Sequence, residues 1–177
     1  MNKFSRGQSK KVTYTPSKAG IVKRIYVGID PGLTGGIAFI VGQKIEVYNM
    51  PIKARHIDCE SLKQLFFRCV YPRVDIFVMI EELSYNPKWG KAAVIKSATE
   101  LGKIHCVLEL GGISYQTVTP RTWKAAMFKG KTKGKQLSID HVVRKYPQVN
   151  LFPGRKTTPH DGIADAICLA EYGRLYA

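Results

Sequence analysis

Four acidic residues stand at positions where a few carboxylates could do chemistry together. Asp30 and Glu81 each end an apolar run of six residues. Asp161 and Asp165 are four residues apart, and on a helix that spacing places both carboxylates on one face, about 5–6 Å apart at Cβ. Clustered carboxylates repel one another and need divalent cations between them. The four acids therefore predict a metal-dependent site.

Most of these acids also have an ordinary structural explanation. Asp30 opens an Asp-Pro-Gly segment, which is common hairpin chemistry. Asp161 could cap a final helix. Glu82 competes with Glu81, and because neighbours on a strand point to opposite faces, only one of the two can face the site with Asp30. Asp165 lies inside an apolar run, so its carboxylate must be paired, metal-bound or incompletely buried.

Length and charge narrow the class of protein. A chain of 177 residues with 45% hydrophobic content has enough material for one domain with a sizeable core. Its net charge of +15 does not suit a small-molecule enzyme and favours a polyanionic partner such as DNA or RNA. A ribosomal or packaging protein would be similarly basic, but here the acids also fall at the ends of predicted elements.

The cysteines and the hydropathy indicate in which cellular compartment the protein is expected. The cysteines occur singly, without a Cys-x-x-Cys pair, and we expect buried, reduced thiols rather than zinc ligands or disulfides at Cys59, Cys69, Cys106 and Cys168. No apolar stretch of about 18 residues and no signal peptide is found. We expect a soluble intracellular protein without a membrane partner, cytoplasmic rather than organellar.

The order of predicted elements indicates a fold. Residues 1–24 are basic and free of acids, and are predicted to form a flexible arm. The domain over 25–177 opens with three antiparallel strands and continues with alternating helices and strands. This is the order of an RNase H-like α/β fold, a mixed five-stranded sheet flanked by helices. The predicted strands are 25–30, 37–41, 44–49, 75–81 and 113–118, and the predicted helices are 59–69, 91 to about 108, a short one from Pro120, about 136–146 and about 160–172.

Four segments together resemble a known family. They are Gly28-Ile-Asp-Pro-Gly-Leu-Thr-Gly-Gly-Ile-Ala38, Ile80-Glu-Glu82, Val118-Thr-Pro-Arg-Thr-Trp-Lys124 and His160-Asp-Gly-Ile-Ala-Asp-Ala166. In this order they resemble the successive motifs of RuvC-like Holliday-junction resolvases, closest to the phage and chloroplast branch. The resemblance covers about residues 25–173. In bacterial members the last two acids are three apart, whereas here residue 162 is glycine and the partner of Asp165 is Asp161.

The resemblance implies an activity and a cofactor. It implies a Mg²⁺-dependent endodeoxyribonuclease in which two Mg²⁺ ions, replaceable by Mn²⁺, are held by Asp30, Glu81, Asp161 and Asp165. Two-metal hydrolysis would leave 5′-phosphate and 3′-hydroxyl ends. The family acts as a homodimer that makes two symmetric nicks in four-way junction DNA, a step of DNA recombination and repair.

Three other functions compete with this interpretation. Asp30-Pro-Gly-Leu-Thr-Gly also resembles the phosphate loop of sugar kinases and actin-like ATPases, but those folds need two such domains. Another RNase H-like nuclease could act on branched DNA generally or on RNA–DNA hybrids. A non-catalytic junction-binding protein is disfavoured because all four acids are present.

Basic and aromatic residues supply candidate DNA contacts. Glycines would let the segment 129–135 follow a phosphate backbone, and an aromatic residue in the loop after Glu81 could stack on an unpaired base at the crossover. A solvated basic loop is the alternative for this segment. Trp123 is predicted to pack, and His160 to cap a helix or lie on the surface. The predicted DNA contacts are Tyr85, Trp89, Lys124, Lys129, Lys131, Lys133 and Lys135.

Overall fold

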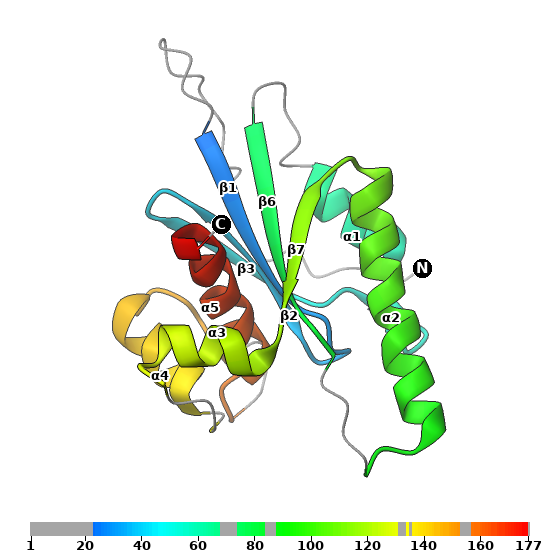
Figure 1. The fold of residues 1–177 in the computed structure, drawn as a ribbon. Coiled ribbons are helices and arrows are strands. Elements are labelled where there is room, and N and C mark those ends of the chain that lie inside the picture. The colour runs from blue at the N-terminus through cyan, green and yellow to red at the C-terminus, as the bar shows by residue number, and fades with distance from the viewer. Residues whose placement is uncertain are drawn as a thin grey trace.

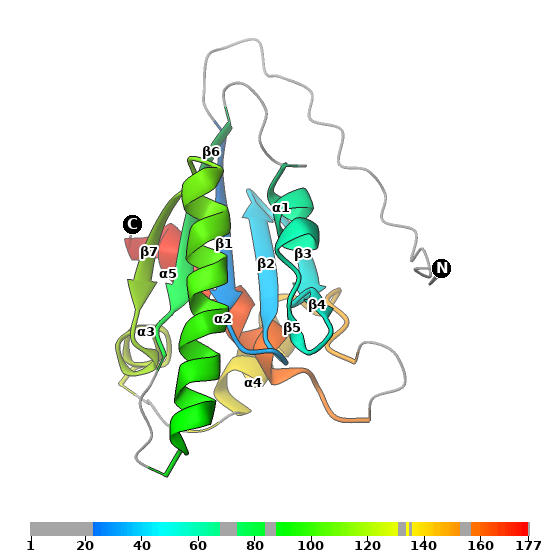
Figure 2. The same ribbon diagram turned by 90° about the vertical axis from the view of Figure 1, so that its right-hand side faces the viewer.

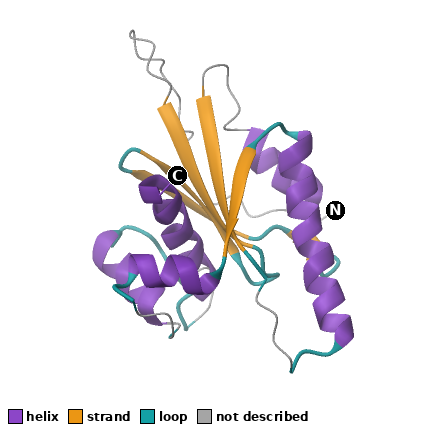
Figure 3. Ribbon diagram, viewed as in Figure 1, coloured by secondary structure: helices purple, strands orange, loops and turns teal. Residues whose placement is uncertain are grey.

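A computed structural model of the protein describes residues 23–67, 74–83, 88–130, 134, 136–152 and 157–176. It contains a five-stranded sheet with helices on both faces (Figures 1 and 3). The sheet strands are β1 (Lys23–Asp30), β2 (Gly36–Val41), β3 (Lys44–Asn49), β6 (Val74–Glu81) and β7 (Ser114–Val118). A separate pair is formed by β4 (Ile52–Lys53) and β5 (His56–Ile57). The helices are α1 (Cys59–Phe67), α2 (Lys91–Leu110), α3 (Pro120–Met127), α4 (Gln136–Lys145) and α5 (Asp161–Tyr176).

The strand order of the sheet is β3-β2-β1-β6-β7. The first three strands pair antiparallel, while β6 pairs parallel with both β1 and β7. The predicted mixed five-stranded sheet is therefore confirmed. β1 begins at Lys23, two residues inside the predicted arm, because Lys23 pairs with Val74 and Arg24 forms a 2.5 Å ion pair with Asp75. Residues 1–22 lie outside the described residues.

Strand alternation divides the core into two layers. Val27 and Ile29 of β1 pack into the cluster that also contains Leu62 of α1 and Ile104 of α2. The opposite face of the sheet packs against α5, which is buried along most of its length, with α3 and α4 beside it (Figure 1). Gly28 of β1 and Met79 of β6 therefore face α5, as do the residues two positions before and after each of them.

Gly28 lets β1 and α5 touch along their backbones. A Cβ at residue 28 would lie 2.0 Å from the carbonyl oxygen of Ala166 and 2.4 Å from the amide nitrogen of Ala170. Any other residue would push the helix away from the strand. This contact fixes the position of α5, and hence of Asp165, relative to the end of β1.

Two further details of the fold differ from the sequence-based expectation. The β4–β5 hairpin was not predicted, because strands of two residues show no alternation. Cys168 is buried as expected, but the prediction was wrong for Cys59 and Cys106, whose helices α1 and α2 turn these thiols to the surface. Cys69 lies outside the described residues. None of the helices in the described part of the chain is long and apolar enough to cross a membrane.

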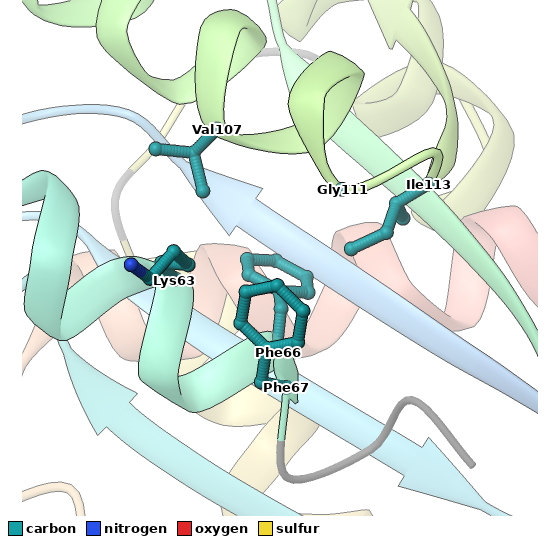
Figure 4. A pocket seen from close by; sticks show the side chains of 6 residues that line it. All are labelled: Lys63, Phe66, Phe67, Val107, Gly111 and Ile113. Atoms are coloured by element: carbon teal, nitrogen blue, oxygen red, sulfur yellow. The ribbon is translucent and has the colours of Figure 1, made fainter.

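A shallow apolar pocket lies between the C-terminal parts of α1 and α2 (Figure 4). Its lining includes Phe66 of α1 and Ile113, the residue that precedes β7. β7 runs parallel to β1 and β6, so Ile113 stands at the end of the sheet where these strands begin. The pocket is therefore remote from the acids, which follow the ends of the strands.

Candidate active site

Asp30 and Glu81 end neighbouring parallel strands. The register pairs Ile29 with Ile80, so the next residues along β1 and β6 are Asp30 and Glu81. Ile29 and Ile80 both belong to the core beneath α1 and α2, so alternation turns the two acids toward α5. The fold therefore brings these carboxylates to one edge of the sheet and to one face of it.

α5 supplies the other two acids. Asp161 is its first residue and Asp165 lies one turn later, and the helix packs against β1, β2 and β6. Burial raises the pKa of Asp30 to about 7, and the negative charges of Glu81, Asp165 and Asp161 add to the rise. Asp30 therefore shares one electrostatic neighbourhood with the three other acids.

Burial and a neighbouring negative charge also raise the pKa of Glu81. Its pKa is raised, first by burial and also by Asp165, whereas a hydrogen bond from Trp123 and the charge of Lys124 oppose the rise. Glu82 lies outside this group: its carboxylate accepts a 2.9 Å hydrogen bond from the Thr117 hydroxyl on the other face of the sheet. The structure thus places Glu81, and not Glu82, beside Asp30.

Gly162 explains why the first acid of α5 stands at residue 161. A Cβ at 162 would lie 2.7 Å from both the Cα of Gly35 and the carbonyl oxygen of Thr34, and 3.0 Å from an oxygen of Asp30. The turn after β1 is thus packed directly against the first turn of α5. No side chain fits at 162 without moving that turn, so the carboxylate is carried by Asp161.

Two consecutive residues of α3 contact two of the acids. The indole N–H of Trp123 donates a 2.8 Å hydrogen bond to Glu81, and the ammonium group of Lys124 donates a 3.1 Å hydrogen bond to Asp165. Trp123 is fully buried. Lys124 was predicted as a DNA contact and Trp123 as packing, and neither prediction included a partner among the acids. The sequence carried no signal for these pairs, which join residues about forty positions apart.

His160 has a structural role at the start of α5. Its Nδ1 accepts a 3.1 Å hydrogen bond from the amide of Ile163, and its own amide donates to the carbonyl of Leu151. His160 is buried. It therefore caps the helix, so that α5 begins at Asp161 rather than at the predicted residue 160.

The donor set fits divalent cations in its chemistry. Four carboxylates offer hard oxygen ligands, and their mutual repulsion would be relieved by cations. As the side chains stand, no three histidine, cysteine or acidic side chains among the described residues form an arrangement that could hold a metal ion. Two of the acids are instead engaged by Trp123 and Lys124. Metal binding would therefore require these side chains to rearrange.

The predicted DNA contacts are only partly described. Trp89 is 43% exposed just before α2, and Lys129 is exposed after α3 with a left-handed φ of 54°. Tyr85, Lys131, Lys133 and Lys135 lie outside the described residues.

A buried acid fixes α4, the helix that follows the basic segment, on α5. Glu171 of α5 accepts hydrogen bonds from His141 at 2.6 Å and Tyr146 at 2.5 Å, and it pairs with Lys145. This network holds α4 against α5.

The raised pKa of Asp30 predicts a pH-dependent stability in the absence of divalent metal. The ordinary pKa of this acid is 3.8, so between that pH and about 7 the folded protein holds a proton that the unfolded chain has released. The free energy of unfolding from this group therefore falls as the pH rises through that window. Urea denaturation in EDTA at pH 5 and pH 8 should show that Asp30→Asn removes part of this loss. Adding Mg²⁺ at pH 8 should stabilise the unsubstituted protein more than Asp30→Asn, and equal gains would contradict metal binding at Asp30.

Trp123→Phe should slow catalysis while leaving the fold intact. Phenylalanine keeps most of the buried ring but loses the N–H that positions Glu81, and a hydrogen bond to a charged group is worth about 1.5–3 kcal/mol, roughly a tenfold effect or more on rate. The Mg²⁺ concentration for half-maximal cleavage should rise as well, which a purely structural role would not produce. Phe128→Leu is the control, because Phe128 packs on Trp123 at 5.9 Å between ring centroids and should alter packing alone.

Comparison with known proteins bears on the fold. No protein-family model and no curated protein sequence matches the chain. Among solved structures, Thermus thermophilus RuvC matches with a TM-score of 0.57 and 17% identity, covering 86% of this chain and 94% of that one. T. thermophilus RuvC in complex with a Holliday junction substrate matches with a TM-score of 0.56 and 15% identity, at the same coverage of both chains. The chain therefore has the RNase H-like fold of RuvC, as its sequence motifs predicted.

Proposed function

We propose that the protein is a structure-selective endonuclease that resolves four-way DNA junctions by paired symmetric nicks. The observation that carries this proposal is that Asp30, at the end of β1, interacts electrostatically with Glu81 of β6 and with Asp161 and Asp165 of α5. The fold it shares with RuvC supports the same assignment, because one of the matched structures holds a Holliday junction substrate.

Two Mg²⁺ ions, or Mn²⁺, are the proposed cofactors, with the four acids as ligands. When bound, such ions would lower the pKa of an attacking water and neutralise charge on the scissile phosphate, so that hydrolysis leaves 5′-phosphate and 3′-hydroxyl ends. Trp123 would hold one oxygen of Glu81 and so orient the other. Lys124 lies among the acids and would neutralise a phosphate oxygen that approaches them.

Affinity and selectivity require different features. The net charge of +15 favours binding to the DNA backbone, and Lys129, Lys131, Lys133 and Lys135 are proposed phosphate contacts. Choice of a junction over a duplex would come from a homodimer with two sites and from an aromatic residue, Tyr85 or Trp89, that stacks on a base exposed at the crossover. Stacking contributes about 1–3 kcal/mol per base, enough to change the cleavage rate without dominating affinity.

One experiment separates this function from its rivals. Purified protein is incubated with labelled four-way junction, linear duplex and RNA–DNA hybrid, each with Mg²⁺ or with EDTA, and the cut positions are mapped. We expect symmetric nicks in the junction, only with Mg²⁺, and little cutting of the duplex. Preferred cutting of the hybrid would indicate a different RNase H-like nuclease, and tight junction binding without cutting under any metal would indicate a non-catalytic binding protein.

A further inference from the structure

The β4–β5 hairpin carries a basic tip. Lys53, Arg55 and His56 are all exposed, and the segment 51–57 contains no acid. Just before the hairpin, the amide of Met50 donates a 3.2 Å hydrogen bond to the carbonyl of Gly35, in the turn that follows Asp30. The hairpin therefore starts beside that turn, at the end of the sheet where β1 ends (Figure 2).

The turn of this hairpin is strained. Ala54 has φ of 51° and Arg55 has φ of 64°, both in the left-handed region. A two-residue hairpin turn of this kind normally contains Asn-Gly, because residues with a Cβ resist these angles. Strained backbone persists where the surroundings impose it, and it is concentrated at functional sites. Here the strained position carries a cationic side chain at the tip.

A buried glutamate holds the hairpin in place. Glu100 of α2 is 2% exposed, and its carboxylate accepts hydrogen bonds from the amide of Ile57 at 2.7 Å and from Nδ1 of His56 at 2.6 Å. Lys103 donates to both of its oxygens at 3.1 Å. Burial alone would raise the pKa of Glu100, but these partners outweigh it and lower the pKa to about 2. A carboxylate that stays ionised between α2 and β5 binds the hairpin through charge-assisted hydrogen bonds.

A rigid, basic projection suits a phosphate backbone. A hairpin whose backbone is already held in place loses little freedom when its cations meet a phosphate. The hairpin packs on the α1 and α2 side of the sheet, because Ile57 belongs to that core layer. Lys124 of α3, which donates a hydrogen bond to Asp165 of α5, lies on the other side of the sheet. Lys124 and the hairpin thus lie toward opposite faces of the sheet.

We propose that the β4–β5 hairpin is a second DNA-backbone contact, in which Lys53 and Arg55 bind phosphates of an arm that leaves the acid edge on the α2 side. The inference rests on the proposed action on branched DNA. It assigns a contact surface separate from segment 129–135, and it assigns Glu100 the task of positioning that surface.

The test measures binding rather than cleavage. Lys53→Gln with Arg55→Gln removes two charges from the tip and leaves His56 on Glu100. Lys44→Gln with Lys63→Gln is the control, since it removes two charges from exposed side chains, one on the β2–β3 hairpin at the opposite end of the sheet and one on α1. Affinity for a labelled four-way junction, a linear duplex and double-stranded RNA is measured by fluorescence anisotropy in EDTA over a range of salt concentrations.

Each lost phosphate contact lowers the magnitude of the log–log salt slope by about 0.9, so the hairpin variant should lose about 1.8 on the junction and the control much less. Slopes equal to those of the control would overturn the proposal and leave the proposed nuclease function standing. Absence of nucleic-acid binding by the unsubstituted protein would overturn both.

Glu100→Gln tests the positioning role separately. This substitution removes a negative charge and on charge alone would strengthen DNA binding. If Glu100 positions the hairpin, junction affinity should fall instead, while urea denaturation shows that the domain remains folded at the assay temperature. An affinity equal to or above that of the unsubstituted protein would exclude the positioning role.

Discussion

Asp30→Asn, Asp161→Asn and Asp165→Asn should each reduce junction cleavage by about 10³-fold or more, because each removes a proposed anionic ligand whose cation would supply several kcal/mol of transition-state stabilisation. Junction affinity in EDTA should stay the same or rise, since losing a negative charge from a basic protein reduces repulsion of DNA. Single-turnover cleavage of a labelled junction in Mg²⁺, with anisotropy in EDTA, measures the two effects separately. Near-normal cleavage by any of these variants would remove that residue from the site.

Glu81 and Glu82 provide a matched pair for the same assay. The two residues are adjacent and identical in type, but Glu81 faces Asp165 and accepts from Trp123, whereas Glu82 accepts from Thr117 on the opposite face. Glu81→Gln should be as damaging as the aspartate variants, and Glu82→Gln should be mild. The reverse result would mean that the acid at the end of β6 has been misassigned by one residue.

The sequence predicts the elements whose signals are local. Apolar runs bounded by turn residues located the five strands of the sheet. The cap at Thr119 was visible as Thr-Pro before a helix, and its side chain accepts a 3.2 Å hydrogen bond from the amide of Thr122. Asp58 likewise accepts from the amides of Glu60 and Ser61 at the start of α1. The β4–β5 hairpin was missed because its strands are too short to alternate and its turn contains neither glycine nor asparagine. Its second strand is held by hydrogen bonds to Glu100, which is distant in sequence.

The features of the candidate site likewise divide into those that a local sequence pattern predicts and those that it does not. The strand-end positions of Asp30 and Glu81 and the four-residue spacing of Asp161 and Asp165 could be read from the sequence, because parity and helical period are local rules. The hydrogen bond from Trp123 to Glu81 and the ion pair between Lys124 and Asp165 depend on how α3 packs beside the sheet and α5. No local pattern encodes that packing, so Trp123 was expected only to fill the core.

Gly162→Ala should destabilise the protein by about 2–3 kcal/mol and also slow cleavage, because one added methyl group overpacks a contact with no free space. The new Cβ would lie 2.7 Å from backbone atoms of Thr34 and Gly35 and 3.0 Å from an oxygen of Asp30. Backbone atoms cannot move aside as a flexible side chain can. The turn that positions Asp30 must therefore shift, and urea denaturation with a parallel cleavage assay would detect both consequences.

Gly102→Ala is the matched control for this substitution. Gly102 also lies within a helix, but a Cβ there would have no neighbour within 4 Å. Replacing an exposed helical glycine with alanine should stabilise the protein by about 1 kcal/mol. The same chemical change is thus expected to have opposite signs in α2 and α5, and a similar effect at both positions would contradict the close packing of the Asp30 turn on α5.

The close packing at Gly162 also determines whether the first acid of α5 can be at residue 162 instead of residue 161. Exchanging the two residues, with Asp161→Gly and Gly162→Asp together, would create the three-residue acid spacing expected of bacterial RuvC-like proteins while keeping the number of carboxylates. If only the count of acids mattered, cleavage would survive the exchange. Because residue 162 has no room for a side chain, we expect the double variant to be at least as unstable as Gly162→Ala and to cut junctions no faster than Asp161→Asn. Cleavage near the unsubstituted rate would show that the turn after β1 can yield, and that the acid spacing is not fixed by this contact.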